Sequence, residues 1–142
     1  LLHPFYRLYW FVCRPKGRLA KVIVTSQNAV LLVKHSYGPA RWVLPGGAVG
    51  KNEDVLDAAK RELSEEVGLH SETMHVLGEF TNVRDYKTDI VTFFLAETTV
   101  KSMRMDDREI VEAQWFTPET LPIAKLSFVA RTGLSMWLKR QI

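Results

Sequence analysis

The stretch from Gly46 to Leu69 constrains the fold most, because it predicts one well-delimited helix between two glycine-containing loops. Asp54 can cap this helix, Asp57 stands three residues on in the acidic position of a capping box, and Gly68 can end it. Apolar residues recur at helical spacing: Val55, Leu56, Ala59, Leu63 and Val67. The sequence therefore predicts an amphipathic helix whose apolar stripe packs on the rest of the domain.

Runs of β-branched and apolar residues around this helix predict strands. The expected strands cover residues 20–25, 29–34, 73–80, 88–97 and 110–116. Residues 26–28 predict a hairpin turn and residues 36–50 a loop, while a helical turn at 117–119 and an amphipathic helix over 125–140 follow. Helices interleaved with strands predict an α/β (α+β) sandwich. No linker-like stretch interrupts the 142 residues, so a single domain over 1–142 is expected, with residues 1–19 as a basic, aromatic N-terminal extension.

Composition excludes several classes of protein. Hydrophobic residues make up 46% and charged residues 25%, which excludes wholesale disorder. No apolar run approaches the roughly 18 to 20 residues that span a bilayer. The single cysteine, Cys13, excludes an intrachain disulfide framework and a cysteine-rich zinc site and favours a reducing compartment. We therefore expect a cytoplasmic protein, and the net charge of +3 is too small to indicate nucleic-acid binding.

The charges are unevenly distributed along the chain. Residues 1–50 contain no Asp or Glu but seven Lys or Arg, whereas residues 51–80 contain eight Asp or Glu. A cationic segment followed by an acidic one suggests a site where a divalent metal and a phosphate meet. Two solvated faces of opposite sign are the alternative explanation.

Three glutamates of the predicted helix share one face. Glu62 precedes Glu65 and Glu66 by three and four residues, so the three carboxylates span an arc of about 100 degrees beside the apolar stripe. Like charges at this spacing raise the pKa of at least one carboxyl unless a cation is present. Clustered oxygen ligands suit Mg²⁺ or Mn²⁺, and the Gly46-Gly47 pair lets main-chain carbonyls approach the same ion.

The spacing around these glutamates resembles the Nudix box. The matching residues are Gly47, Glu53, Arg61, Glu62, Leu63, Glu65, Glu66, Gly68 and Leu69, and the similarity extends roughly over residues 20–122. The resemblance implies a mixed β-sheet sandwiched between helices. It also implies that Glu62, Glu65 and Glu66 bind a divalent metal with the Gly46 carbonyl, and that Glu53 and Arg61 form an ion pair that braces the loop against the helix.

The same resemblance implies a reaction. Nudix enzymes hydrolyse a diphosphate bond in a nucleoside diphosphate linked to another moiety, using Mg²⁺, for which Mn²⁺ is a substitute. A metal-activated water, deprotonated with help from Glu65 or Glu109, would attack one phosphorus. Glu109 is the expected late-loop carboxylate, and its rivals are Asp106, Asp107 and Glu112.

The substrate is left open by the sequence. Candidates to hold phosphate oxygens are Lys34, Arg41 and Arg84, and candidates to stack on a base are Tyr37, Trp42 and Phe80. Asp85 stands where many ADP-ribose hydrolases have proline, which counts against that substrate. Tyr86 resembles a tyrosine of dinucleoside-polyphosphate hydrolases.

Other readings of the chain remain as alternatives. They are a non-catalytic Nudix-like nucleotide-binding or regulatory module and a hydrolase acting on capped RNA or dinucleoside polyphosphates. Residues 1–18 could also contact a membrane, and a homodimer is a further option. A small nucleotide-type molecule is the expected partner.

Overall fold

The computed structural model describes residues 16–141 except residues 39, 85–86, 100 and 107. Most of the predicted N-terminal extension lies outside this part. Six strands occur among the described residues: β1 (Lys16–Ser26), β2 (Ala29–His35), β3 (Gly46–Ala48), β4 (His75–Arg84), β5 (Lys87–Glu97) and β6 (Ile110–Phe116). The helical elements of this part are α2 (Val55–Val67), α3 (Phe128–Arg140) and the 3₁₀ turns η1 (Pro118–Thr120) and η2 (Ile123–Lys125).

The strands form one mixed sheet. Their order is β4-β5-β1-β2-β6, and β3 pairs with β1 beside this path. β1 and β5 run parallel from the pair Lys16↔Thr88 to the pair Thr25↔Glu97, while the other neighbours are antiparallel. The predicted mixed sheet between helices is thus confirmed, and the parallel pair joins strands far apart in the sequence.

β1 and β2 separate soon after their hairpin, and β3 lies beside β1 where they have separated. They pair only next to the turn, at Thr25↔Val30 and Ser26↔Ala29. Further from the turn, β1 pairs with β3, and Val33 of β2 forms an isolated bridge with Val43. The Pro45-Gly46-Gly47 segment is thereby inserted between two diverging strands.

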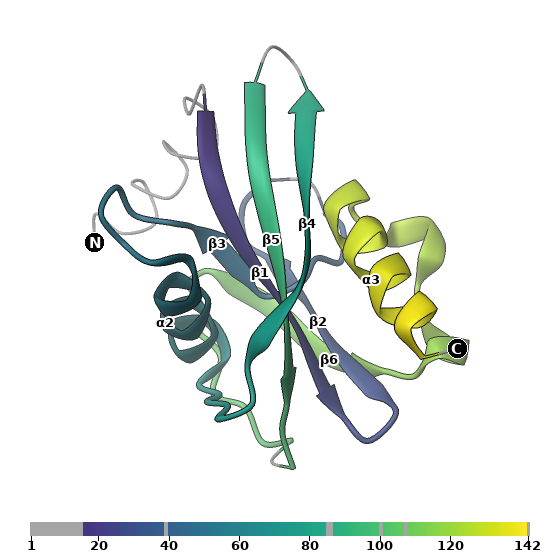
Figure 1. Cartoon of the computed structure of the whole chain (residues 1–142). Coiled ribbons are helices and arrows are strands. Elements are labelled where there is room, and N and C mark those ends of the chain that lie inside the picture. Colours follow the sequence, from purple (N-terminus) through teal and green to yellow (C-terminus); the bar gives the residue numbers. More distant parts are fainter. Residues whose placement is uncertain (1–15, 39, 85–86, 100, 107, 142) are drawn as a thin grey trace.

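The helices cover opposite faces of the sheet (Figure 1). Alternation along β1 sends Ala20, Val22 and Val24 to a core shared with α2, because successive side chains of a strand point to opposite faces. Ile23 belongs to the other core, which is closed by Leu134 and Trp137 of α3. The sheet therefore lies between two cores, one closed by α2 and the other by α3.

Several boundaries differ from the sequence prediction. β1 begins at Lys16 rather than at residue 20, and the predicted loop over 36–50 contains β3. The last helix begins at Phe128 rather than at residue 125, because the Ser127 side chain caps it by accepting a hydrogen bond from the Ala130 N–H at 3.1 Å. Among the described residues, no helix is both long and apolar enough to cross a membrane.

Candidate active site

Helix α2 presents the three predicted glutamates as its sequence indicates. The Asp54 side chain accepts a hydrogen bond from the Leu56 N–H, and Gly68 ends the helix with a φ of 69°, a left-handed conformation that favours glycine. Glu62 and Glu66 are buried against the sheet, with 1% and 0% exposure. The Glu65 side chain is 41% exposed, so the helix face turns from core to solvent across these residues.

Glu66 joins three elements. Its Oε1 accepts a hydrogen bond from the Gly46 N–H of β3 at 2.8 Å, and its Oε2 lies 2.9 Å from His35 Nε2 at the end of β2. Gly46 has a φ of 134°, and a Cβ there would lie 2.0 Å from the Ala20 carbonyl oxygen. Glycine is thus required where β3 passes close to β1 and offers its N–H to Glu66.

Glu62 lies against Gly47. A Cβ on Gly47 would be 2.8 Å from the Glu62 carboxyl carbon, so the missing side chain leaves the space that the carboxylate occupies. Glu62 Oε1 accepts a hydrogen bond from Arg61 Nη1 at 2.9 Å. The two glycines of the loop therefore have separate roles. The absence of a side chain at Gly46 allows close approach to the β1 backbone, and its absence at Gly47 leaves room for the buried Glu62 carboxylate.

Arg61 and Glu53 form the predicted ion pair. Arg61 Nε and Nη2 donate to Glu53 Oε2 and Oε1 at 2.8 and 2.9 Å, and Nη2 also donates to the Ala48 carbonyl at 3.2 Å. The Gly50 N–H donates to Glu53 Oε1 at 2.9 Å. The hydrogen bond from Arg61 lowers the pKa of Glu53 from 4.5 to about 2, against an opposing effect of burial and with help from Gly50. The Glu53 carboxylate in turn raises the pKa of Arg61.

Main-chain hydrogen bonds connect the segment that contains Glu109 to the end of β2 and to Glu66. The Ser36 N–H, next to His35, donates to the Glu109 carbonyl at 2.7 Å, and the Asp106 N–H donates to the Glu66 carbonyl at 3.0 Å. Glu109 is completely buried. Its rivals differ: the Asp106 side chain faces Arg108 at 3.6 Å, Glu112 pairs with Lys34 at 3.8 Å, and Asp107 lies outside the described residues.

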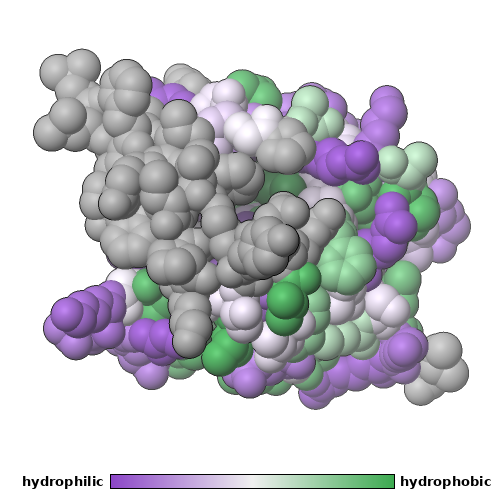
Figure 2. Space-filling view, turned by 90° about the horizontal axis from the view of Figure 1, so that it is seen from above, coloured by the Kyte–Doolittle hydropathy of each residue, from purple (hydrophilic) through white to green (hydrophobic). Residues whose placement is uncertain are grey.

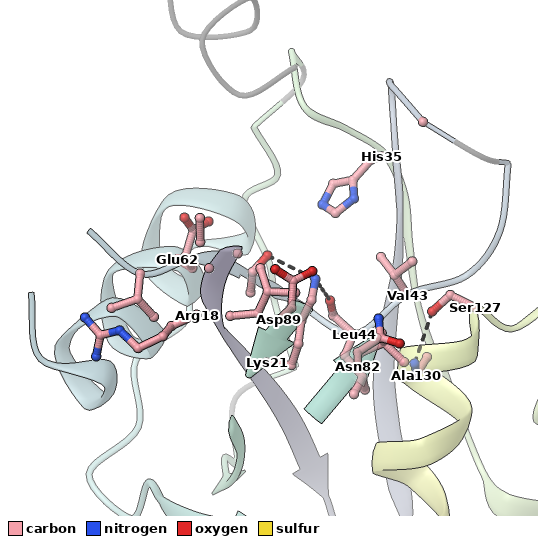
Figure 3. A pocket seen from close by; sticks show the side chains of 18 of the residues that line it. Arg18, Lys21, His35, Val43, Leu44, Glu62, Asn82, Asp89, Ser127 and Ala130 are labelled. Carbon is pink, nitrogen blue, oxygen red and sulfur yellow. Dashed lines mark hydrogen bonds between the residues drawn. The ribbon is translucent and has the colours of Figure 1, made fainter. Parts of the chain in front are cut away.

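A large cavity opens next to Glu62 and Glu65, whereas Glu66 and Glu109 are not among the residues that line it. Its volume is about 1550 Å³, and it runs from β3 and α2 across β1 and β5 to the start of α3. Figure 3 shows Glu62 on one side of it, Lys21 and Asp89 in the middle and Ser127 on the other side. At the end of the molecule seen in Figure 2, green apolar residues are exposed among purple polar ones. The cavity thus combines acidic, basic and apolar walls, which suit a ligand with both charged and apolar parts.

Only some of the residues predicted to bind substrate line the cavity. Arg41 and Tyr37 line the cavity, and the Tyr37 ring stacks on His35 with centroids 5.0 Å apart. Lys34 is not among the lining residues, because its ammonium lies 4.6 Å from the Trp42 ring centroid and faces Glu112. Trp42 is a buried core residue against Phe116, and Phe80 stacks on Phe93. Asp85, Tyr86 and the Arg84 side chain lie outside the described part.

Several cavity residues were missed by the sequence prediction, among them Lys21, His35, Asp89 and Phe128. Asp89 is 9% exposed in β5, whereas Phe128 is 51% exposed at the first turn of α3. A charged residue within an otherwise apolar strand pattern was the available signal for Lys21 and Asp89. Nothing local distinguishes His35 or Phe128, because their positions depend on contacts with distant elements.

The residues present fit a hard divalent cation in donor chemistry. Glu62, Glu65, Glu66 and the Gly46 carbonyl offer oxygen atoms only, and Gly47 leaves the space that one carboxylate fills. In the described part of the chain, no three Asp, Glu, His or Cys side chains already form a metal-ligand group. Glu62 is hydrogen-bonded to Arg61, and Glu66 to Gly46 and His35. A bound metal ion would therefore replace some of these contacts.

Comparison with known proteins gives consistent matches. The profile of the NUDIX domain matches residues 14–135. The human 8-oxo-dGDP phosphatase NUDT18 is 33% identical over 107 residues, which are 71% of this chain and 32% of that protein. The oxidized purine nucleoside triphosphate hydrolase of Mus musculus is 31% identical over 107 residues, or 74% of this chain and 69% of the mouse protein.

Solved structures of NUDIX hydrolases have a similar fold. The MutT NUDIX hydrolase of Burkholderia pseudomallei superposes with a TM-score of 0.78 at 24% identity, covering 85% of this chain and 97% of that one. This chain spans about a third of the human phosphatase and more than two thirds of the mouse hydrolase.

Proposed function

Because this chain belongs to the NUDIX family, we propose that it hydrolyses a diphosphate bond in a nucleoside diphosphate derivative with the help of Mg²⁺ or Mn²⁺. The observation that supports this most is the position of Glu66. This buried carboxylate is held between β3 and the end of β2, and its partners His35 and Gly46 line a cavity that is large enough to admit a nucleotide. Hydrogen bonds from neighbouring groups commonly orient the carboxylates that bind metal ions, and both oxygens of Glu66 have such a contact, which favours a metal ligand.

Glu62, Glu65, Glu66 and the Gly46 carbonyl would hold the metal ion. When bound, the ion supplies positive charge that offsets the negative charge developing on the phosphate oxygens. Arg61 positions Glu62 through its Nη1 and is itself held by Glu53. His35 and the Gly46 N–H orient the Glu66 carboxylate.

Proton removal from the attacking water falls to a carboxylate near these groups. Glu109 Oε and Glu65 Oε are the two candidates, and they differ in environment: Glu109 is completely buried, and the Glu65 side chain is 41% exposed. The Arg41 side chain, which lines the cavity, is suited to hold phosphate oxygens. Tyr37 and Phe128 line the same cavity and offer flat surfaces to a base.

Two relatives suggest the first substrates to test. Their names specify 8-oxo-dGDP and oxidized purine nucleoside triphosphates, so we propose a purine nucleotide, oxidised or not, as the substrate. Dinucleoside polyphosphates, nucleotide sugars, ADP-ribose and capped RNA complete the panel. Turnover of none of them, together with nucleotide binding, would favour a binding module.

The test compares wild type, Glu66→Gln and Glu72→Gln on this panel with Mg²⁺ and with Mn²⁺. Glu72 is an exposed glutamate outside the cavity lining, and it serves as the matched control. We expect Glu66→Gln to lower kcat by about a hundredfold or more, roughly 3 kcal/mol, with an unchanged melting temperature. Activity of Glu66→Gln within tenfold of wild type would overturn the assignment of Glu66.

A further inference from the structure

A cluster of polar side chains lies on the face of the sheet that packs under α3. Lys21 of β1, Asn82 of β4 and Asp89 of β5 all line the cavity. Asp89 comes two residues before Val91 and four before Phe93, which are core residues under α3, so it points to that face. Asn82 is the cross-strand partner of Asp89, and such partners share a face. The adjacent strands β4, β5 and β1 thus bring polar groups together in the cavity wall.

The Asp89 carboxylate and the Lys21 ammonium lie beside each other in this cluster (Figure 3). Asp89 is 9% exposed, and Lys21 Nζ also donates to the Leu44 and Gly46 carbonyls, each at 3.3 Å. A negative and a positive group side by side add no net charge to the cavity wall, and the carboxylate repels the oxygens of a phosphate. The pair is therefore suited to a neutral ligand group that has both hydrogen-bond donors and acceptors.

The base of a nucleotide has such a group along one edge. The Watson–Crick edge of guanine carries the O6 acceptor and, next to it, the N1–H and N2–H donors. A carboxylate accepts more than one hydrogen bond, and a flexible lysine can exchange one carbonyl acceptor for another. Lys21 Nζ would donate to O6, and the Asp89 oxygens would accept from N1–H and N2–H. Adenine has an amino group and an unprotonated N1 at those positions, so it would set a donor against the ammonium and a lone pair against the carboxylate.

An aromatic ring lies near the cluster. Phe128 lines the cavity and is 51% exposed, and its ring contacts Phe80 edge-on, with centroids 6.2 Å apart. Phe80 comes two residues before Asn82 in β4, so both point to the α3 face. Stacking on such a ring is open to every base, because each base has a π-face. The choice between bases therefore falls to the polar groups.

We propose that Lys21 and Asp89 recognise the base of the substrate and select guanine over adenine, with Asn82 as a further hydrogen-bonding group beside them. The inference rests on the proposed function and narrows its purine nucleotides to those of guanine. Oxidation of guanine at C8 leaves O6, N1–H and N2–H unchanged, so the pair accepts guanine and 8-oxoguanine alike.

The experiment measures the binding of nucleoside monophosphates to the chain by isothermal titration calorimetry without a metal ion. We expect wild type to bind GMP about tenfold or more tightly than AMP, with IMP, which lacks the N2 amino group, in between. dGMP, which lacks the ribose 2′-hydroxyl, should bind within about threefold of GMP. 1-Methyl-GMP, in which N1 carries no hydrogen, should bind as weakly as AMP.

Two variants test the residues themselves. An amide at position 89 offers one acceptor and one donor, a pattern that adenine complements, so Asp89→Asn should bring the ratio of GMP to AMP affinity below about twofold. Lys21→Met removes the donor to O6 and should lower the same ratio to about threefold or less. The matched controls are Asp57→Asn and Lys60→Met, at exposed positions outside the cavity lining, and both should keep the wild-type ratio. Melting temperatures identify a variant that does not fold, and the wild-type nucleotide series then decides by itself.

The outcomes separate this pair from the proposed function. If wild type binds no GMP or binds GMP and AMP equally, or if both folded variants keep the wild-type ratio, Lys21 and Asp89 do not select the base and the proposal is overturned. Much weaker binding of dGMP than of GMP, with GMP and AMP equal, would assign the cluster to a ribose hydroxyl and overturn it as well. In these cases, hydrolysis that Glu66→Gln abolishes would leave the proposed function standing. Guanine-selective binding that both variants lose, without hydrolysis of any substrate on the panel, would support the pair and overturn the proposed function instead.

Discussion

Replacing Glu53 with glutamine tests whether the charge of the Glu53–Arg61 pair stabilises the folded chain. The substitution keeps an oxygen that can accept the Gly50 N–H, and it removes the charge that Arg61 contacts through two nitrogens at 2.8 and 2.9 Å. Loss of stability in Glu53→Gln therefore reports mainly on the ion pair and less on the turn at Gly50.

The size of the effect follows from the pKa of Glu53. A shift from 4.5 to about 2 corresponds to roughly 3.4 kcal/mol at about 1.36 kcal/mol per unit. The Glu53 side chain is 24% exposed, and water screens the pair, so about 1 to 1.5 kcal/mol is the realistic contribution. For a chain of this length, that is a loss of roughly 3 to 5 °C in melting temperature near neutral pH.

The dependence on pH has a definite sign. Because the folded-state pKa of Glu53 is lowered, its stabilising effect is fully present above about pH 4.5 and is lost as the pH falls towards about 2. Urea unfolding at pH 6.5 and at pH 2.5 should therefore show a smaller difference between wild type and Glu53→Gln at the lower pH.

The control is Glu72→Gln, which removes an exposed carboxylate and should leave both free energies of unfolding nearly unchanged. A difference between wild type and Glu53→Gln that stays constant from pH 6.5 to pH 2.5 would refute the electrostatic reasoning. No difference at either pH would refute the role of the pair in stability.

The two loop glycines and an exposed aromatic give three further predictions. Gly46→Ala should prevent folding or cost more than about 3 kcal/mol in urea unfolding, because the new Cβ would lie 2.0 Å from the Ala20 carbonyl oxygen at a φ of 134°; a stable variant would contradict this. Gly47→Ala should instead lower kcat by about tenfold or more, with little change in melting temperature. The reason is that its Cβ would displace the Glu62 carboxylate and no main-chain atom. An unchanged kcat would argue that Glu62 need not occupy that space. Phe128→Ala should raise KM about fivefold or more for a purine nucleotide through lost stacking. The loss of stability should be small, because the residue is 51% exposed although its ring contacts Phe80 edge-on; a lowered melting temperature with an unchanged KM would show that the ring serves packing alone.

The local parts of the fold were predictable because they depend on neighbours in the chain. The spacing of Leu63 and Val67, the cap at Asp54 and the glycine at Gly68 determine helix α2 within a few turns. The hairpin at residues 26–28 depends on equally local chemistry and was also predicted. β3 was missed, since three residues carry no periodicity and exist as a strand only by pairing with β1.

The predicted pairing of Glu53 with Arg61 is present in the structure, and the roles proposed for the glutamates remain predictions. Helical spacing places Glu62 and Glu66 on one face, but it does not distinguish the buried carboxylates from the half-exposed Glu65. Burial is decided by the angle at which α2 meets the sheet, which is a property of the packed core.

Sequence alone therefore specified the spacing of the three glutamates, the helix that carries them and the family, because spacing along one helix is a short-range quantity. Only the tertiary structure shows that His35 and Gly46 contact Glu66. It also shows that Lys34 lies over the Trp42 ring and that Lys21 donates to the Gly46 carbonyl. These contacts join residues 8 to 31 positions apart in the chain. They arise because β1 and β2 diverge beyond their hairpin and β3 fills the gap, and this arrangement depends on pairing and packing between segments that are far apart in the chain.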